Sequence, residues 1–322
     1  MRLTRSARAF AVAAARRRRA PHDRAKTVTL PDPAVDYPAF AAEKGRAALE
    51  AAVGHLITEE HWTDERLLDI GNAWTRDHFD DGFFLSPVPR DLPAVSLVFV
   101  QSRDGNTAAD NPGDLGGGDT DLHLIYEGLS RVAADAVLAG ATTTSGRVFF
   151  SVWRPELVAL RESLGLPRHP AQIVVTQAGR IDLDGTLLFN LPDVPVYILA
   201  GERARERLSK ALQDRPWITL IPIEQDDLRA SLAKLCEFGI RRISAVGGRS
   251  AASALIDAGV VQDLYMTTTS TSAGEPGTPF YVGRRQIHPR LVLRKRSAED
   301  VVPPIVFEHS TLTISESREL VA

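Results

Sequence analysis

The sequence predicts an α/β protein, in which a sheet of buried strands carries helices on its faces, preceded by a small helical appendage and a basic tail. Two observations lead to this prediction. From residue 94 onward, short apolar runs of strand length alternate with segments whose apolar residues recur at helical spacing. This alternation is typical of a sheet covered by helices. Before residue 92, first arginines and then prolines interrupt the pattern.

The composition is that of an ordinary globular protein. The chain has 322 residues, of which 44% are hydrophobic and 25% are charged, and its formal net charge is −3. This charge gives no general attraction to nucleic acid. A single cysteine, Cys236, excludes a disulfide framework and any multi-thiolate metal site. No run of about 18 apolar residues is present, so we predict no membrane span and expect a cytoplasmic protein.

The first 26 residues concentrate positive charge, because eight arginines and Lys26 stand against the single acid Asp23. Like charges at this density repel one another and cannot build a core, so we predict that residues 1–38 form a disordered basic tail. An export signal does not fit, since no apolar stretch follows the arginines. An organelle presequence and translated sequence upstream of the true start remain open. A nucleic-acid arm has little support, because no aromatic residue stands within the arginine run at 16–19.

Residues 39–91 are interpreted as a small helical appendage. The stretch 41–57 is rich in Ala, Glu and Leu and predicts one helix, and apolar residues between Trp62 and Phe79 predict a second. The segment 77–81 groups a histidine with carboxylates. Because no second element can be named that would complete a metal site, we interpret this segment as a solvated polar edge and predict no metal.

The alternating region can be followed element by element. An apolar run bounded by Pro93 predicts the first strand, and Leu122, Ile125 and Leu129 mark one face of the helix that follows. Gly259 stands where the glycine after a helix end belongs. Strands are predicted at 95–100, 136–139, 173–176, 196–199, 243–246 and 264–269, and helices at 120–133, 228–235 and 251–258. Ligands of such sheets gather at the carboxyl ends of the strands, so the residues just after strands are the candidates for a site.

Glycines follow three of these strands. Gly247-Gly248-Arg249-Ser250 leads from a strand into a helix, where glycine lets a ligand approach the backbone and the helix N-terminus offers N–H groups to a phosphate. The segments 140–144 and 201–203 follow two other strands and supply hydroxyl groups and an arginine. Neither the dinucleotide fingerprint nor the phosphate-binding loop motif is present.

Three spaced motifs together resemble a known family. Ser102-Arg103-Asp104-Gly105 follows the first strand, the segment 135–142 reads Asp-Ala-Val-Leu-Ala-Gly-Ala-Thr, and Val246-Gly247-Gly248 precedes the last long helix. In this set the chain resembles the pyrimidine reductase domain of riboflavin biosynthesis (the RibD C-terminal domain), which belongs to the dihydrofolate reductase-like superfamily. The resemblance covers roughly residues 92–310. It implies that residues 92–322 form a mixed, mostly parallel sheet flanked by helices.

The resemblance also implies a function. Members of this family bind NADPH, transfer a hydride to a phosphoribosylaminopyrimidine, opening its ribose to a ribityl chain, and are usually homodimers. Carried over by motif, the cofactor-binding residues would be, from the nicotinamide end to the diphosphate and the adenosine end, Gly140, Ala141, Thr142 and Thr143, then Gly247, Gly248, Arg249 and Ser250, and finally Thr176, Gly201 and Arg203.

On the substrate side the resemblance points to Ser102, Asp104 and Arg147. Asp104 is the candidate catalytic residue, which would polarise or protonate the reacting group. A plain turn aspartate before glycine is the alternative interpretation of Asp104.

Two departures from the family pattern leave the substrate open. The family often has glutamate where this chain has Val246, and a polar run where this chain has residues 145–150. A reductase of a pterin-like or other small heterocycle therefore remains a second hypothesis. A catalytically inactive nucleotide-binding protein that acts through its helical appendage is a third. The deaminase activity of bifunctional relatives is excluded, because it requires a pair of zinc-binding thiols and Cys236 is the only cysteine.

Overall fold

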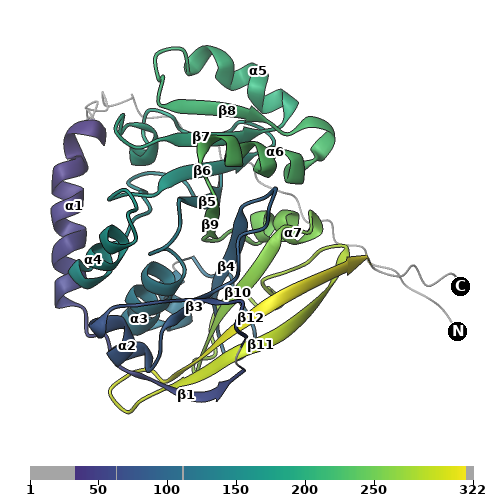
Figure 1. Cartoon of the computed structure of the whole chain (residues 1–322). Coiled ribbons are helices and arrows are strands. Elements are labelled where there is room, and N and C mark those ends of the chain that lie inside the picture. Colours follow the sequence, from purple (N-terminus) through teal and green to yellow (C-terminus); the bar gives the residue numbers. More distant parts are fainter. Residues whose placement is uncertain (1–32, 63, 111, 317–322) are drawn as a thin grey trace, which may run out of the picture. The chain divides into compact units, whose positions relative to one another are not determined.

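Ten strands form one mixed sheet in the computed structural model, which describes residues 33–62, 64–110 and 112–316 (Figure 1). In spatial order they are β1 (Leu56–His61), β11 (Arg285–Ser297), β12 (Ile305–Glu316), β10 (Val261–Thr269), β4 (Ala94–Gln101), β9 (Arg242–Ala245), β5 (Ala136–Gly140), β6 (Ala171–Thr176), β7 (Val196–Ala200) and β8 (Ile218–Pro222). The strands from β10 to β8 are all parallel, whereas β12, β11 and β1 continue the sheet antiparallel. The predicted α/β class and the mostly parallel sheet are confirmed.

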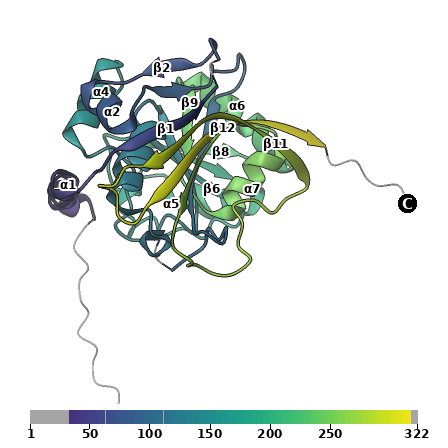
Figure 2. The same ribbon diagram turned by 90° about the horizontal axis from the view of Figure 1, so that it is seen from below.

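Helices cover both faces of the sheet because its strands are apolar on both sides. Along β5, for example, Leu138 packs into one core cluster and its neighbours Val137 and Ala139 pack into another. One face carries α6 (Leu228–Leu235) and α7 (Arg249–Asp257). The other face carries α1 (Pro33–Glu50), α2 (Ala73–Phe79), α3 (Gly118–Thr120) with the π-helical segment η2 (Asp121–Leu129), α4 (Pro155–Ser163) and α5 (Glu202–Ala211). Figure 2 shows α1, α2 and α4 on one side of the strands and α6 and α7 on the other.

The remaining elements are short. A two-stranded sheet pairs β2 (Leu68–Ile70) with β3 (Phe83–Leu85), and α2 between them begins at a capping box formed by Asn72 and Thr75. Single turns of 3-10 helix are η1 (Pro112–Leu115), η3 (Leu187–Phe189), η4 (Glu224–Asp226) and η5 (Cys236–Phe238). Among the helices of the described residues, none is long and apolar enough to span a membrane.

The helical appendage predicted for residues 39–91 needs correction, because this region also contains β1, β2 and β3. β1 is an integral edge strand of the main sheet, paired with β11 from Leu56 opposite Ser297 to His61 opposite Leu293. Only Leu56 of β1 is buried, so the strand lacks the apolar alternation from which a strand is recognised, and its pairing partner lies far away in sequence.

The predicted basic tail, residues 1–38, lies outside the described residues as far as position 32. Its last positions were wrongly assigned, because α1 begins at Pro33. Phe40 and Ala48 of α1 are buried in the core cluster that also contains β6 and β7. The boundary predicted at residue 92 stays a prediction.

Candidate functional site

A cleft of about 870 Å³ opens at the carboxyl ends of β5 and β6 and runs along α7. Its volume lies within the range of small-molecule sites, roughly 300–1,000 Å³. Six of the predicted cofactor-binding residues line it together, namely Gly140, Ala141, Thr142, Thr176, Gly248 and Ser250. The remaining predicted cofactor residues, Thr143, Gly201, Arg203, Gly247 and Arg249, do not line it. The cleft therefore joins three strand ends that are distant in sequence.

The glycine pair shapes the wall of the cleft formed by α7. Gly247 and Gly248 have φ angles of 121° and 77°, in the region that glycine adopts without strain. A Cβ atom at Gly248 would lie 3.2 Å from Thr143 Oγ1, so the two strand ends approach closely there. Gly248 is the N-cap of α7, and no side chain caps this helix. A helix start of this kind presents backbone N–H groups and a positive dipole end to an anion.

The end of β5 forms the neighbouring wall. The backbone N–H of Ala141 donates to the carbonyl of Val175 on β6 at 3.1 Å, and that of Thr143 donates to the carbonyl of Gly140 at 2.9 Å. The hydroxyl group of Thr144 donates to the carbonyl of Ala141 at 3.1 Å and is buried. The turn thus uses Thr144 to hold its own backbone and leaves Thr142 facing the cleft.

The loop after β6 supplies three lining residues that the sequence did not single out, Gln177, Ala178 and Arg180. Thr176 holds this loop, because its hydroxyl oxygen accepts the N–H of Gly179 at 3.0 Å. Gly179 has a φ of 64°, and a Cβ atom there would lie 2.9 Å from Ala204 Cα of α5. The loop therefore packs against α5, while the exposed Arg180 borders the cleft. The position of this loop directly after β6 was the signal in the sequence that could have pointed to its residues.

Gly201 and Arg203 belong to the start of α5, the helix against which this loop packs. Gly201 is the buried N-cap of α5, and its N–H donates to the carbonyl of Thr176 at 3.1 Å. Arg203 stands exposed in the first turn of α5. An arginine that lines the cleft is thus found at position 180, whereas position 203 faces solvent outside it.

The three predicted substrate residues do not line the cleft. Ser102 is buried in a tight turn after β4, where its hydroxyl oxygen accepts the N–H of Asn106 at 3.3 Å and its carbonyl accepts the N–H of Gly105 at 2.9 Å. Asp104 is exposed in the same turn. These contacts account for Ser102 and Gly105 as turn residues, and the substrate roles of Ser102 and Asp104 stay predictions.

Arg147 has partners on α1. Its Nε donates to Asp36 Oδ2 at 2.7 Å, and its Nη1 lies 3.5 Å from Glu43 Oε2. Its guanidinium also lies over the ring of Phe40, 5.5 Å from the centroid. Arg147 therefore ties α1 to the loop after β5, a contact that could not be expected while residues 33–38 were assigned to a tail.

One partly buried acid, Asp121, was not among the residues predicted from the sequence. Asp121 begins η2 and has Thr267 of β10 as a neighbour, while Leu115 at the end of the preceding η1 accepts the hydroxyl of Thr269 at the end of β10 at 2.7 Å. Asp121 Oδ1 is buried without a hydrogen-bond partner. Burial raises the pKa of its carboxyl group to about 6, and only the nearby hydroxyl of Thr267 opposes this shift. A carboxyl group of this kind retains a proton close to neutral pH and can act as an acid.

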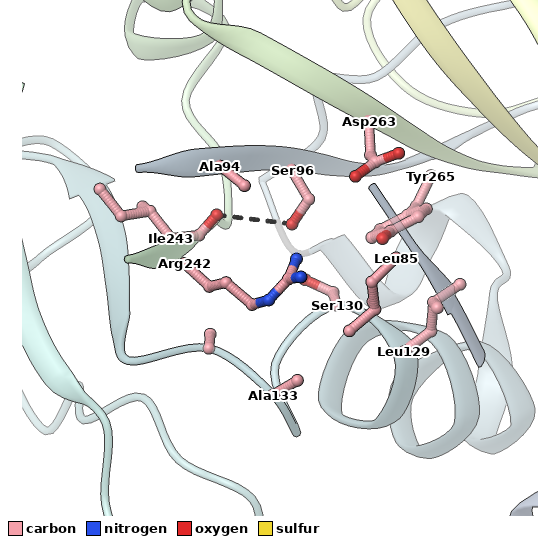
Figure 3. A pocket seen from close by; sticks show the side chains of 11 residues that line it. Leu85, Ala94, Ser96, Leu129, Ser130, Ala133, Arg242, Ile243, Asp263 and Tyr265 are labelled. Carbon is pink, nitrogen blue, oxygen red and sulfur yellow. Dashed lines mark hydrogen bonds between the residues drawn. The ribbon is translucent and has the colours of Figure 1, made fainter. Parts of the chain in front are cut away.

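A second, much smaller pocket lies at the opposite edge of the sheet, beside the first residues of β4 and β9 (Figure 3). Its volume is about 20 Å³, enough for one water molecule. The acid that lines it, Asp263, already accepts a hydrogen bond from Ser86 Oγ at 2.7 Å and pairs with His309 Nε2 at 2.8 Å. Arg242 donates to the carbonyl of Ser86 at 2.8 Å. We therefore interpret this pocket as part of the packed core.

The family of the chain follows from its similarity to known proteins. The RibD C-terminal domain family matches residues 93–307. The chain belongs to this family. No curated protein matches it. Its fold is similar to that of a pyrimidine reductase-like protein of Corynebacterium diphtheriae, with a TM-score of 0.55 and 21% identity over 69% of this chain and 92% of the other. A riboflavin biosynthesis reductase of Saccharomyces cerevisiae is 19% identical, with a TM-score of 0.47 over 71% of this chain and 93% of the other.

This member of the RibD C-terminal domain family carries its whole candidate site within the matched residues. The lining of the cleft extends from Gly140 to Arg284, and Asp121 lies inside the same range. The elements α1 to β3 precede the match. The family resemblance seen in the sequence is therefore confirmed, and the elements before residue 93 are additions to the matched region.

Proposed function

We propose that the protein is an NADPH-dependent reductase that acts on a phosphoribosylaminopyrimidine-type substrate and opens its ribose to a ribityl chain. Membership of the RibD C-terminal domain family and the reductases of similar fold support an oxidoreductase. The observation that carries the proposal is the cleft, which brings together the ends of β5 and β6 and the start of α7, with six predicted cofactor residues in its lining. We further propose that the protein works as a homodimer.

The residues of the cleft fit a dinucleotide. Gly248 and Ser250 at the uncapped start of α7 would hold the diphosphate through backbone N–H groups. Gly140 to Thr142 would border the nicotinamide ribose, and Thr176 and Arg180 would lie at the adenosine end, where a guanidinium can pair with a 2′-phosphate. When bound, the cofactor supplies the hydride, while the protein supplies position and electrostatics.

A reduction of this kind also needs a proton, because hydride adds to a carbon atom and the atom bonded to that carbon must be protonated. Two carboxyl groups are candidates, the exposed Asp104 and the partly buried Asp121, whose Oδ1 atom is buried. Neither lines the cleft, but Asp121 lies beside Thr267 of β10, whose carboxyl end reaches the same edge of the sheet as those of β5 and β6, and its raised pKa of about 6 leaves part of the carboxyl protonated near neutral pH. We therefore assign the proton donor to Asp121.

One observation favours a second candidate function. Val246, which stands where the family often has glutamate, is only 6% exposed and belongs to a core cluster. That strand end therefore offers no carboxylate to the polar edge of an aminopyrimidine. A small heterocycle without that amino-substituted edge would need no such partner, so among the second class, reductases of a pterin-like or other small heterocycle, this observation favours the heterocycles that lack it.

The first test is a titration with NADPH and with NADH, followed by energy transfer from the four tryptophans. NADPH should bind more tightly, and Arg180→Gln should weaken NADPH binding about tenfold with little effect on NADH, the equivalent of about 1.4 kcal/mol. Arg203→Gln is the matched control. If only the Arg203 variant loses the preference for NADPH, the contact with the 2′-phosphate belongs to Arg203, as predicted from the sequence, and not to Arg180. No binding of either nucleotide at millimolar concentration would refute both reductase hypotheses and leave an inactive protein.

The second test distinguishes the substrates. Oxidation of NADPH is followed by absorbance with a phosphoribosylaminopyrimidine and, separately, with a dihydropterin. Turnover of the aminopyrimidine supports the first proposal, and turnover of the pterin alone supports the second. Binding of NADPH without turnover of either compound would contradict both assignments of substrate.

A further inference from the structure

A cluster of metal-ligating side chains lies apart from the cleft, where the end of α2 meets the start of β1. His55 directly precedes β1, while Asp77 and His78 stand in the last turn of α2. One candidate ligand atom from each residue lies within 4.8 Å of those of the other two. The Nε2 atom of His55 is 3.4 Å from Asp77 Oδ2. None of the three residues lines the cleft.

In each of the two imidazole rings, the Nδ1 atom lies within hydrogen-bond distance of an oxygen atom. His55 Nδ1 lies 2.6 Å from Asp300 Oδ2, and the backbone N–H of His55 donates to the other oxygen of Asp300 at 3.2 Å. His78 Nδ1 lies 3.1 Å from the carbonyl oxygen of Trp74. With Nδ1–H donated to these acceptors, Nε2 is the atom of each ring that binds a metal, which displaces any proton held there. In the metal-free protein His55 Nε2 faces Asp77 Oδ2, and Nδ1 of His78 lies 3.5 Å from the same oxygen. A histidine whose second nitrogen is held by a carboxylate or carbonyl is the arrangement that metal-binding histidines adopt.

We propose that His55, Asp77 and His78 form a binding site for a first-row divalent transition-metal ion, with Zn²⁺ as its reference ion. Two imidazoles and one carboxylate suit zinc, nickel, copper or cobalt, whereas Mg²⁺ and Ca²⁺ prefer oxygen ligands alone. Tetrahedral zinc with ligands at about 2.0–2.1 Å separates them by about 3.4 Å, the distance already found between His55 and Asp77.

The third ligand requires a small movement. The two imidazole rings lie face to face, with centroids 4.5 Å apart and planes inclined by 20°, so a rotation of the His55 ring or of the His78 ring must bring both Nε2 atoms toward one ion. The exposure of the side chains permits movement of the His55 ring, which is 44% exposed, and of Asp77, which is 71% exposed, whereas His78 is 16% exposed and packs against Trp74. This exposure also leaves the fourth coordination position to water.

Two carboxylates flank His55, while Arg154 is the nearby cation on the side of His78. Asp300 Oδ2 lies 2.6 Å from His55 Nδ1, and Asp77 Oδ2 lies 3.4 Å from His55 Nε2. The same carboxylates would stabilise a divalent ion at that place. Bound there, the ion would connect α2, the start of β1 and, through Asp300, the β11–β12 connection, so it would stabilise the attachment of the N-terminal elements to the sheet.

The test uses the full chain after treatment with a chelator, titrated with Zn²⁺ in competition with a chromophoric chelator. One equivalent should bind with a micromolar or lower dissociation constant, and His55→Ala or His78→Ala should weaken binding at least tenfold. His61→Ala is the matched control, because His61 also pairs with one carboxylate, Asp81, at 3.2 Å, but among the residues that the structure describes it belongs to no group of three candidate ligands. Equal binding by the wild type, the His55 variant and the His78 variant would overturn the proposal, as would the absence of binding at 100-fold excess of Zn²⁺.

Two further variants keep the test valid if a histidine variant unfolds. Asp77→Asn changes only an exposed ligand, and Asp300→Asn changes only the acceptor behind His55. The second should weaken Zn²⁺ binding by about 10–100-fold, the usual effect of such outer partners. Zn²⁺ should raise the thermal unfolding midpoint of the wild type and of the His61 variant, and not that of the Asp77 variant. An equal rise in the Asp77 variant, or displacement of Zn²⁺ by millimolar Mg²⁺, would contradict the assigned ligands.

Discussion

Replacing Asp121 by asparagine tests whether burial of its carboxyl group beside Thr267 of β10 favours the protonated form. The pKa of this group is raised from 3.8 to about 6 in the folded protein. As the pH rises through 4, the unfolded chain loses this proton first, so between about pH 4 and pH 6 the folded state loses stability. Above about pH 6 the loss in the free energy of unfolding stays constant. At about 1.4 kcal/mol per pKa unit, it amounts to at most about 3 kcal/mol.

Asparagine keeps the shape of the side chain and cannot ionise, so the variant should escape this penalty. We expect the free energy of unfolding of Asp121→Asn to exceed that of the wild type by up to about 3 kcal/mol above pH 6, and to approach it near pH 4. Urea unfolding of both proteins at pH 4, 5, 6, 7 and 8 measures the difference. Because only this difference is used, other groups that titrate in both proteins cancel.

The same variant tests the proposed proton donor. General acids contribute about 10²–10⁴-fold to turnover, so Asp121→Asn should lower kcat by at least about 100-fold while NADPH binding is kept. Asp104→Asn is the comparison, because it changes the exposed carboxyl group that competes for this role. A stability difference that is the same at every pH would refute the reasoning about burial. Loss of turnover in the Asp104 variant alone would refute the assignment of the donor.

Two further predictions concern the cleft and the packing of α1. Gly248→Ala should weaken NADPH binding at least tenfold, because the new Cβ would lie 3.2 Å from Thr143 Oγ1, whereas Gly259→Ala, with a similar φ of 66° but open space around it, should not. Equal losses in the same fluorescence titration would attribute the effect to backbone strain instead of cleft shape. His169 contacts α1, because its Nε2 lies 2.7 Å from the hydroxyl of Tyr37. Burial, and then the nearby arginines, lower the pKa of His169 from 6.5 to about 4, so the wild type should lose stability through this residue as the pH falls from about 6.5 to 4, by less than the roughly 3 kcal/mol of a fully buried ring. His169→Gln should remove that part of the acid sensitivity in urea unfolding, and an unchanged pH profile would contradict it.

The parallel part of the fold could be predicted from the sequence because its strands are buried on both faces and are therefore locally apolar. The strand predicted at 136–139 is β5, and the one predicted at 196–199 is β7. The two closing strands expected from the family resemblance, around 291–296 and 305–309, were too short, since pairing extends β11 and β12 into polar residues at 285–290 and 310–316. Their length depends on a distant partner strand, which composition in a short window does not record.

That strand ends distant in sequence would meet at one cleft was predictable for a similar reason. Glycines after strands are a local signal, and the sheet brings two of the three glycine-bearing strand ends, those of β5 and β9, to one cleft together with the end of β6, whereas Gly201 after β7 does not line it. The burial of Asp121, by contrast, depends on packing against Thr267 of β10, and the partners of Arg147 belong to a helix that was assigned to a different part of the chain. Neither environment leaves a pattern in the neighbouring residues.

The pairing of β1 with β11 has a practical consequence for anyone who expresses a shorter protein. The family match begins at residue 93, yet a chain cut there would lose β1, leave the backbone edge of β11 unpaired, and lose the contribution of Phe40 to the core. Unpaired strand edges recruit other chains and lead to aggregation. Recombinant fragments and domain fusions should therefore start no later than Pro33, where α1 begins.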